Sequence, residues 1–178
     1  MEVEKLELEG LLLVTLDIYR DDRGFFCEKF HEEKFKDLGI SENFIQDNHS
    51  RSAPKVLRGL HFQNNPGQGK LVSVVRGSIF DVVVDIRKDS STYGKWTSVE
   101  ISEENGRALW VPEGFAHGFV VTSDHDADVT YKVTGKYNPK GEGGIIWNDP
   151  DLGINWPISD PVLSDRDQKQ PAFSALSI

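Results

Sequence analysis

Cysteine is nearly absent from this sequence. Among 178 residues there is one, Cys27, so an intrachain disulfide framework is excluded. A chain of 20.0 kDa buries about two-thirds of the surface that it exposes when unfolded, so the fold needs no covalent cross-link. By its length alone, the sequence predicts a single domain over residues 1–178.

Basic residues and long apolar runs are also scarce. Lys and Arg number 20 against 29 Asp and Glu, a formal net charge of −9. This balance disfavours binding to nucleic acid or to an anionic membrane surface, but it permits a small phosphorylated ligand, which responds to the local field of a cleft. The early apolar run at residues 11–14 is too short to span a bilayer, and the charged first ten residues lack a signal-peptide core. We therefore expect a soluble, cytoplasmic protein with neither nucleic acid nor membrane as a partner.

Short segments with alternating polar and β-branched residues dominate the rest of the chain. Such segments occupy residues 70–76, 78–87, 95–101 and 127–133. Gly and Pro separate them at close spacing, a pattern that predicts a β-sandwich or barrel. One helix is expected over residues 32–38, ended by Gly39, with a short helical turn near residues 165–169. From residue 149 onward, the Pro- and Asp-rich chain is expected to wrap irregularly over the body.

Two clusters of polar residues follow Gly-rich turns. Residues 56–63 read VLRGLHFQ and residues 112–119 read PEGFAHGF. Each places a histidine at the edge of an expected strand. The clusters are similar to the two motifs that line the mouth of a cupin barrel. The second has the cupin form Pro-x-Gly-x-x-His, whereas the first, His-x-His, is interrupted by Gln63.

The interruption argues against a metal. A catalytic metal of this type takes about three protein ligands, usually imidazoles and a carboxylate. Gln63 is a poor ligand for a transition metal, and a nearby Lys70 would repel a cation. We therefore predict no metal and no cofactor. Without a metal, an imidazole is free to act as a base near neutral pH.

Each of these residues also has a purely structural interpretation. A single histidine in a strand, such as His61, is often a hydrogen-bonded core group. His117 follows a turn that fixes a barrel corner, and Tyr131 is equally a core aromatic residue. Arg58 and Lys70 favour the functional interpretation, because two cations beside a half-buried pocket are costly unless they meet an anion.

The spacing of Arg58 and His61 imposes a geometric condition. Strict alternation places these two side chains on opposite faces of one strand. For both to reach one pocket, Gly59 must mark a bulge or a kink.

Ordered motifs over nearly the whole chain resemble the dTDP-4-dehydrorhamnose 3,5-epimerase family, metal-free cupins of sugar-nucleotide metabolism. They include RDDRGFF at 20–26, FIQDN at 44–48, VLRGLHFQ at 56–63, QGKLV at 68–72, PEGFAHGF at 112–119 and LSDRD at 163–167. The resemblance implies a mainly β fold: a cupin-type double-stranded β-helix, or jelly-roll, barrel with one or two short helices.

The resemblance also implies an activity. The family converts dTDP-4-dehydro-6-deoxy-D-glucose to dTDP-4-dehydro-L-rhamnose by removing and returning protons at carbons 3 and 5. By resemblance, His61 is the base and Asp167 the carboxylate that orients it. Lys70 stabilises the enolate, and Tyr131 returns a proton on the opposite face.

Binding roles are implied in the same way, with the dTDP-4-keto-6-deoxy sugar nucleotide as the partner and a homodimer as the assembly. Arg58 matches a phosphate contact. Arg23 and Glu28 match residues that contact the nucleotide bound by the other subunit of the dimer. The amino-terminal strand of each subunit is expected to pair with the sheet of its partner. The other matched binding residues are Gln46, Asp47, Asn48, His117, Glu142 and Arg166. Arg166 stands where the family often has lysine.

Three alternatives remain open from the sequence. A relative that inverts only one carbon would share the base, the lysine and the tyrosine. A cupin that binds a nucleotide sugar without catalysis is disfavoured by the joint presence of His61, Lys70, Tyr131 and Asp167, because a binder needs no acid–base pair. A metal-dependent cupin oxygenase or isomerase is disfavoured by Gln63.

Overall fold

The structure is a computed structural model that describes residues 1–176. The short segments in which polar and β-branched residues alternate form strands. The strands are β1 (Glu2–Lys5), β2 (Leu12–Thr15), β3 (Ile18–Asp21), β4 (Gly24–Cys27), β5 (Gln46–Ser52), β6 (Leu57–Gln63), β7 (Lys70–Arg76), β8 (Ser78–Asp85), β9 (Trp96–Ser102), β10 (Arg107–Val111), β11 (Phe115–Val121), β12 (Ala127–Val133) and β13 (Glu142–Gly144). The helical elements are α1 (Glu32–Asp37) and the 3₁₀ turns η1 (Asp167–Lys169) and η2 (Phe173–Ala175).

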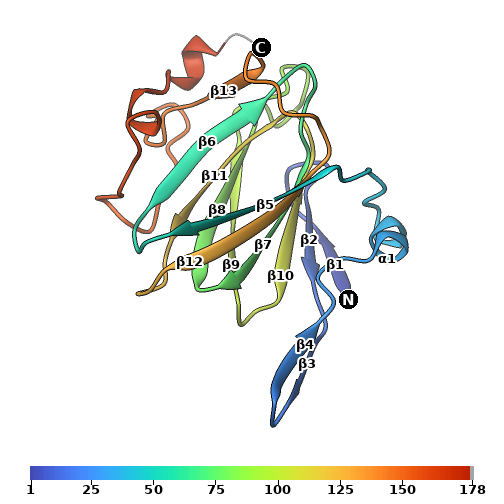
Figure 1. Cartoon of the computed structure of the whole chain (residues 1–178). Coiled ribbons are helices and arrows are strands. Elements are labelled where there is room, and N and C mark those ends of the chain that lie inside the picture. The colour runs from blue at the N-terminus through green and yellow to red at the C-terminus, as the bar shows by residue number, and fades with distance from the viewer. Residues whose placement is uncertain (177–178) are drawn as a thin grey trace.

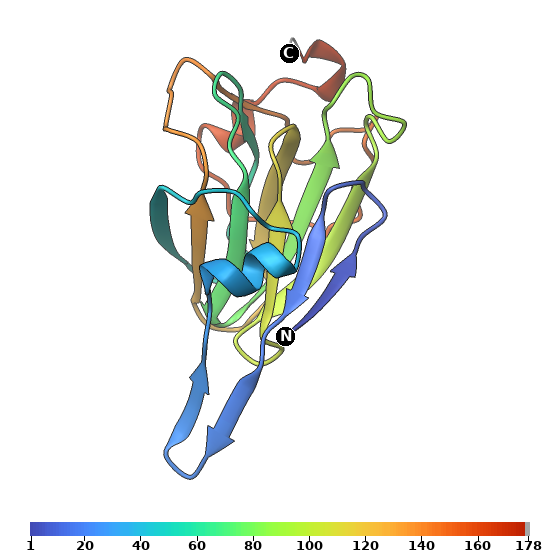
Figure 2. The same cartoon turned by 90° about the vertical axis from the view of Figure 1, so that its right-hand side faces the viewer.

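Two antiparallel sheets face each other in a jelly roll (Figure 1). One has the strand order β1-β2-β10-β7-β12-β5 and the other the order β13-β6-β11-β8-β9. The hairpin of β3 and β4 forms its own two-stranded sheet and projects away from both (Figure 2). The mainly β, cupin-type jelly roll predicted from the sequence is confirmed.

The main core lies between the two sheets. Val72 and Val74 of β7 pack there with Val83 of β8. Leu71, which immediately precedes Val72, points the other way and packs with Phe35 of α1 in a separate outer cluster. This period of two places even-numbered β7 residues on the inner face, which is the face that Lys70 shares with Val72.

Most of the predicted elements match the structure closely. Segments 70–76 and 127–133 coincide with β7 and β12, and the other two differ from β8 and β9 by one or two residues at their ends. Helix α1 ends where Gly39 adopts a φ of +95°. The chain from residue 149 to residue 176 is irregular, as predicted, apart from the turns η1 and η2. Turn η1 lies within the helical turn expected at residues 165–169, whereas η2 was not predicted. No helix among the described residues is long and apolar enough to cross a membrane.

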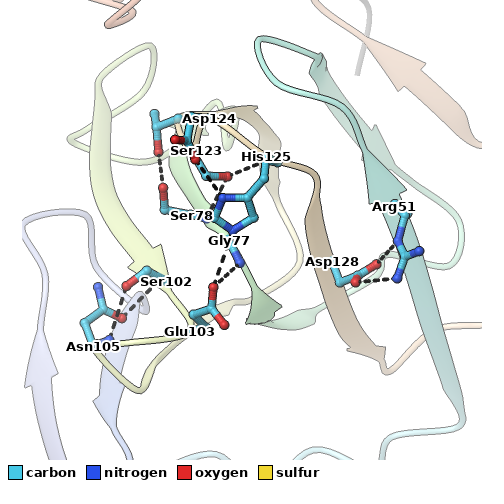
Figure 3. A network of polar contacts seen from close by, with 11 residues as sticks. Arg51, Gly77, Ser78, Ser102, Glu103, Asn105, Ser123, Asp124, His125 and Asp128 are labelled. Atoms are coloured by element: carbon cyan, nitrogen blue, oxygen red, sulfur yellow. Dashed lines mark hydrogen bonds and ion pairs between the residues drawn. The ribbon is translucent and has the colours of Figure 1, made fainter.

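Polar contacts hold the loops and one sheet edge in place (Figure 3). The Glu103 carboxylate accepts a hydrogen bond of 2.8 Å from the backbone N–H of Gly77 and lies 3.6 Å from the His125 ring. Arg51 of β5 donates two hydrogen bonds of 2.8 Å to Asp128 of β12. The second contact matters for the site, because it holds the edge strand β5 in register with β12.

Candidate active site

A cavity of about 420 Å³ is lined by strands of both sheets. Its polar lining comes from β5, β6, β7, β11, β12 and the carboxyl-terminal segment, and consists of Ser50, Arg58, His61, Lys70, His117, Tyr131, Ser164, Arg166 and Asp167. Val56 forms a parallel bridge with Val162. That bridge attaches the carboxyl-terminal segment to the start of β6, and so brings residues 162–167 to the cavity.

A bulge in β6 brings Arg58 and His61 to the same wall. His117 of β11 pairs with His61 while Phe119 pairs with Arg58, so two steps on β11 span three on β6. The extra residue lets both side chains line the cavity. Gly59 has a φ of +135°, and a Cβ at this position would lie 2.5 Å from the Cα of Gly118. The predicted bulge is therefore confirmed, and it requires glycine.

We expect Gly59→Ala to destabilise the protein by about 1–3 kcal/mol more than Gly39→Ala. Gly39 is a matched control, because it also has a positive φ, +95°, and the nearest atom to an added Cβ is 3.9 Å away, an ordinary van der Waals contact. The difference therefore isolates the clash with β11 from the backbone cost. Urea denaturation of both variants measures it, and equal losses of unfolding free energy would show that the close approach at Gly59 is unimportant.

His61 and Asp167 form a hydrogen-bonded pair. The Nε2 atom of His61 lies 2.5 Å from Oδ1 of Asp167, and Oδ2 accepts a 2.9 Å hydrogen bond from the Ser164 hydroxyl. Burial raises the pKa of Asp167, but the hydrogen bonds from His61 and Ser164 outweigh it, so the net pKa falls. Asp167 is thus a carboxylate at neutral pH. It fixes the imidazole and leaves the second ring nitrogen for proton transfer.

A second pair, absent from the sequence prediction, joins His117 to Asp81. Both carboxylate oxygens of Asp81 lie 2.9 Å from Nε2 of His117, and Asp81 is fully buried. A signal was present in the sequence, since Asp81 interrupts the apolar run at residues 79–84 of β8 and a buried carboxylate needs a partner. The pair holds the His117 ring directly beside the register position of His61.

Lys70 and Tyr131 face the cavity from adjacent strands, β7 and β12. Burial lowers the pKa of Lys70, while the charges of Asp81 and Glu142 act to raise it. Burial raises the pKa of Tyr131, Arg58 opposes that rise and Glu142 adds to it. Tyr131 is consequently a neutral phenol at physiological pH, with a proton to give.

Strand β5 separates three residues that the sequence groups together. Residues directly opposite each other on antiparallel strands point to the same face. Asn48 is opposite Tyr131, and its Oδ1 accepts a 2.9 Å hydrogen bond from Gln46. Asp47 is opposite Lys132 and forms a 2.7 Å ion pair with it. Gln46 and Asn48 thus share the face of Tyr131, whereas the side chain of Asp47 lies on the other face.

Glu142 and Arg166 meet at 3.2 Å between Oε2 and Nη1. The hydroxyl of Tyr137 donates a 3.2 Å hydrogen bond to the same oxygen. Tyr137 is 57% exposed and was not among the predicted site residues. Arg166 lines the cavity. Its ion pair with Glu142 therefore places Glu142 next to the cavity as well.

Arg23 and Glu28 lie apart from the other predicted residues within one chain. Arg23 is in the projecting hairpin (Figure 2) and pairs with Asp21 at 2.5 Å. Glu28 follows the hairpin and pairs with Lys34 at 2.6 Å. Neither lines the cavity of its own chain.

Gln63 has a structural role. Its amide nitrogen donates to the carbonyls of Pro66 and Lys136 at 2.8 and 2.9 Å, and its oxygen accepts a 2.8 Å hydrogen bond from the N–H of Asn138. These contacts hold two loops at the end of β6. Within residues 1–176, no group of three or more His, Cys, Asp and Glu side chains is arranged to hold a metal ion.

Comparison with known proteins assigns the geometry to a family. The model of the dTDP-4-dehydrorhamnose 3,5-epimerase family matches residues 5–175. The chain belongs to this family. A dTDP-4-dehydrorhamnose 3,5-epimerase of Methanothermobacter thermautotrophicus is 50% identical over 167 residues, which cover 92% of this chain and 90% of the relative. That of Escherichia coli is 47% identical and covers 95% and 92%.

Solved structures of this epimerase family agree with the fold. A dTDP-6-deoxy-D-glucose-3,5-epimerase of Legionella pneumophila, in complex with dTDP-4-keto-L-rhamnose, has a TM-score of 0.95 and 45% identity over 99% of this chain and 94% of its own. A 3'-monoepimerase of Streptomyces bikiniensis, in complex with dTDP-quinovose, has a TM-score of 0.88 and 35% identity over 95% and 86%.

Proposed function

We propose that this chain converts dTDP-4-dehydro-6-deoxy-D-glucose to dTDP-4-dehydro-L-rhamnose, inverting carbons 3 and 5 on the route to dTDP-L-rhamnose. The observation that carries the proposal is the His61–Asp167 pair sharing one cavity with Lys70 and Tyr131. Membership of the epimerase family supports it. We place the reaction in the cytoplasm, because the substrate is a charged, soluble nucleotide.

Proton removal is the first step. Carbons 3 and 5 both neighbour the ketone at carbon 4, so loss of either proton gives an enolate delocalised onto the ketone oxygen. His61 takes the proton as general base, and Asp167 stabilises the imidazolium that forms. Ser164 in turn holds Asp167, so both members of the pair enter the reaction already oriented.

Enolate stabilisation is the role we assign to Lys70. Its ammonium group shares the cavity with His61 and is partly desolvated, which strengthens its attraction for a developing negative charge. Asp81 and Glu142 favour its charged form. His117 lines the same cavity, with its ring held in place by Asp81. We propose that it contacts the carbonyl region of the sugar.

Proton return completes the inversion. Tyr131 lies on β12 of one sheet and His61 on β6 of the other, so the two groups approach a bound hexose from different sides. The enolate carbon accepts a proton from Tyr131, and the phenolate that results recovers one from solvent. The His61 imidazolium releases to solvent the proton that it took from the sugar, which returns both groups to their starting state. The atoms balance without a redox step, because one C–H bond breaks and another forms at the same carbon.

Arg58 is the diphosphate contact that we propose. Its Nε donates a 2.9 Å hydrogen bond to Ser52, and its Nη2 donates a 3.2 Å hydrogen bond to the carbonyl of Arg51. These contacts hold the guanidinium at the cavity without neutralising it. Gln46, Asn48, Arg166, Glu142 and His117 are the remaining binding residues proposed within the same chain.

Product analysis tests the activity. Incubation with the 4-keto sugar nucleotide, followed by NMR, should show inversion at both carbons. The second candidate is a single-carbon epimerase, because the chain also matches a 3'-monoepimerase at 35% identity. A product inverted at one carbon alone would select that candidate, and an unchanged substrate would overturn both.

We also propose a homodimer in which Arg23 and Glu28 complete the site of the partner subunit. The projecting hairpin supports this, because it exposes Phe25 and Phe26 at 59% and 67% and keeps Arg23 away from its own cavity. An exposed apolar hairpin is readily explained when a second copy covers it.

Mixing two impaired variants tests this arrangement. Arg23→Ala and His61→Asn each damage every site in their own homodimer, but a mixed dimer contains one site with both residues intact. Random reassociation should restore about a quarter of wild-type activity at low substrate concentration. Activity no greater than the average of the two separate variants, or full activity from a strict monomer, would contradict the shared site.

Tyr131→Phe tests proton return. The change removes one hydroxyl and keeps the ring, so the enolate still forms at His61 but is reprotonated mainly from the His61 face. In deuterated water we expect recovered substrate to carry deuterium next to the ketone, while epimerised product falls steeply. NMR of substrate and product measures both. Equal loss of exchange and inversion would instead give Tyr131 a role in forming the enolate.

A further inference from the structure

The hydroxyl of Ser50 is a polar atom that the fold leaves unpaired. Ser50 lies on β5 and lines the cavity. Its Oγ is screened from solvent and has no hydrogen-bond partner within residues 1–176. Ser50 is opposite Val129, which also lines the cavity. Since opposite residues share a face, the Ser50 side chain is on the cavity side of the sheet.

Neighbouring polar side chains are satisfied. On the same face of β5, Ser52 accepts a 2.9 Å hydrogen bond from Arg58, and Asn48 accepts one of 2.9 Å from Gln46. On the next strands, the Ser73 hydroxyl pairs with Thr130 at 3.0 Å. Nearly all buried polar groups in folded proteins have a partner, so a lone exception in a binding cavity calls for one from outside the chain.

The position of Ser50 indicates which partner this is. Two residues after Ser50, on the same face of β5, is Ser52, which accepts a hydrogen bond from the guanidinium of Arg58. Two residues before Ser50, again on the same face, is Asn48, which is opposite Tyr131. Ser50 therefore lies between the residue assigned to the diphosphate and the residue assigned to the hexose.

We propose that Ser50 is a substrate-binding residue whose hydroxyl donates a hydrogen bond to an oxygen at the junction of the hexose and the diphosphate. This rests on the proposed function, which supplies that ligand. A serine hydroxyl turns about a single side-chain bond, and it acts as both donor and acceptor. Rotation toward the cavity brings it to an oxygen-rich part of the sugar nucleotide.

Binding of dTDP-glucose, which has no ketone to react, tests the proposal directly. Ser50→Ala should weaken its affinity about tenfold, the effect of losing one hydrogen bond to a charged or polar oxygen. Ser73→Ala is the matched control, because its hydroxyl pairs on the outer face, and it should bind as the wild type does. Titration with dTDP locates the contact: an equal loss places it on the phosphate and a smaller loss on the hexose.

Stability separates this role from a structural one. Because Ser50 makes no hydrogen bond within the described chain, Ser50→Ala should unfold at the same or higher urea concentration than the wild type. Lower stability, or unchanged affinity for both ligands, would overturn the proposal. Failure of the wild type itself to bind dTDP-glucose would instead contradict the proposed function.

Discussion

His61→Asn is expected to lower kcat by about 10²–10⁴, the range that a positioned general base contributes. Asparagine keeps a hydrogen-bonding group next to Asp167 but cannot accept a proton in the physiological range. Nucleotide binding should change little, because Arg58 and the β5 residues are untouched. The measurement is a single-turnover assay with the 4-keto sugar nucleotide, together with titration of dTDP.

Asp167→Asn changes the partner of the base and not the base itself. It leaves the imidazole in place but removes the carboxylate 2.5 Å from Nε2, so the base is weaker and less well oriented. We expect a smaller loss of kcat than for His61→Asn. Near-normal turnover by His61→Asn would mean that another group removes the proton.

Lys70→Met is expected to lower kcat by about 10²–10³, by analogy with the loss of one donor to an oxyanion. Methionine fills similar space without the charge. The charge matters most when the ketone oxygen becomes an enolate, so the interaction is stronger in the transition state than in the ground state. Steady-state kinetics should therefore show a large change in kcat and a small one in KM.

Lys132→Met provides the matched control. Lys132 immediately precedes Val133, the register partner of Lys70, but its side chain points to the outer face of the sheet, where it pairs with Asp47. It should retain wild-type kcat. If Lys70→Met raised KM and left kcat unchanged, Lys70 would be a binding residue only.

The positions of the main strands and the bulge were predictable from the sequence. Period-two alternation defines β7 and β12 to the residue, because each has one face in the core. The bulge at Gly59 followed from spacing, since Arg58 and His61 can share a cavity only if one extra residue intervenes.

The pairing of the site residues was not predictable in the same way. His61 and Asp167 are 106 positions apart, and their contact depends on where an irregular segment attaches. No periodicity marks such a segment. The family resemblance suggested that contact, whereas the Asp81–His117 pair, formed across two strands of the β8 sheet, was missed.

Strand β5 shows a further limit. The motif FIQDN suggests three neighbouring nucleotide contacts, but period two divides their side chains between two faces. Register with β12 decides which face is inward, and Asp47 is on the outer one with Lys132. Motif matching alone does not separate these two faces, and the same register places Ser50 on the inward one.

Deuterium labelling follows the proton exchange that we assign to His61 and Tyr131 at two carbons of one sugar. The wild type is incubated with dTDP-4-dehydro-6-deoxy-D-glucose in deuterated water, and the product is analysed by NMR and mass spectrometry. We expect a product that carries solvent deuterium at both carbon 3 and carbon 5. An epimerised product without deuterium at those carbons would contradict this assignment.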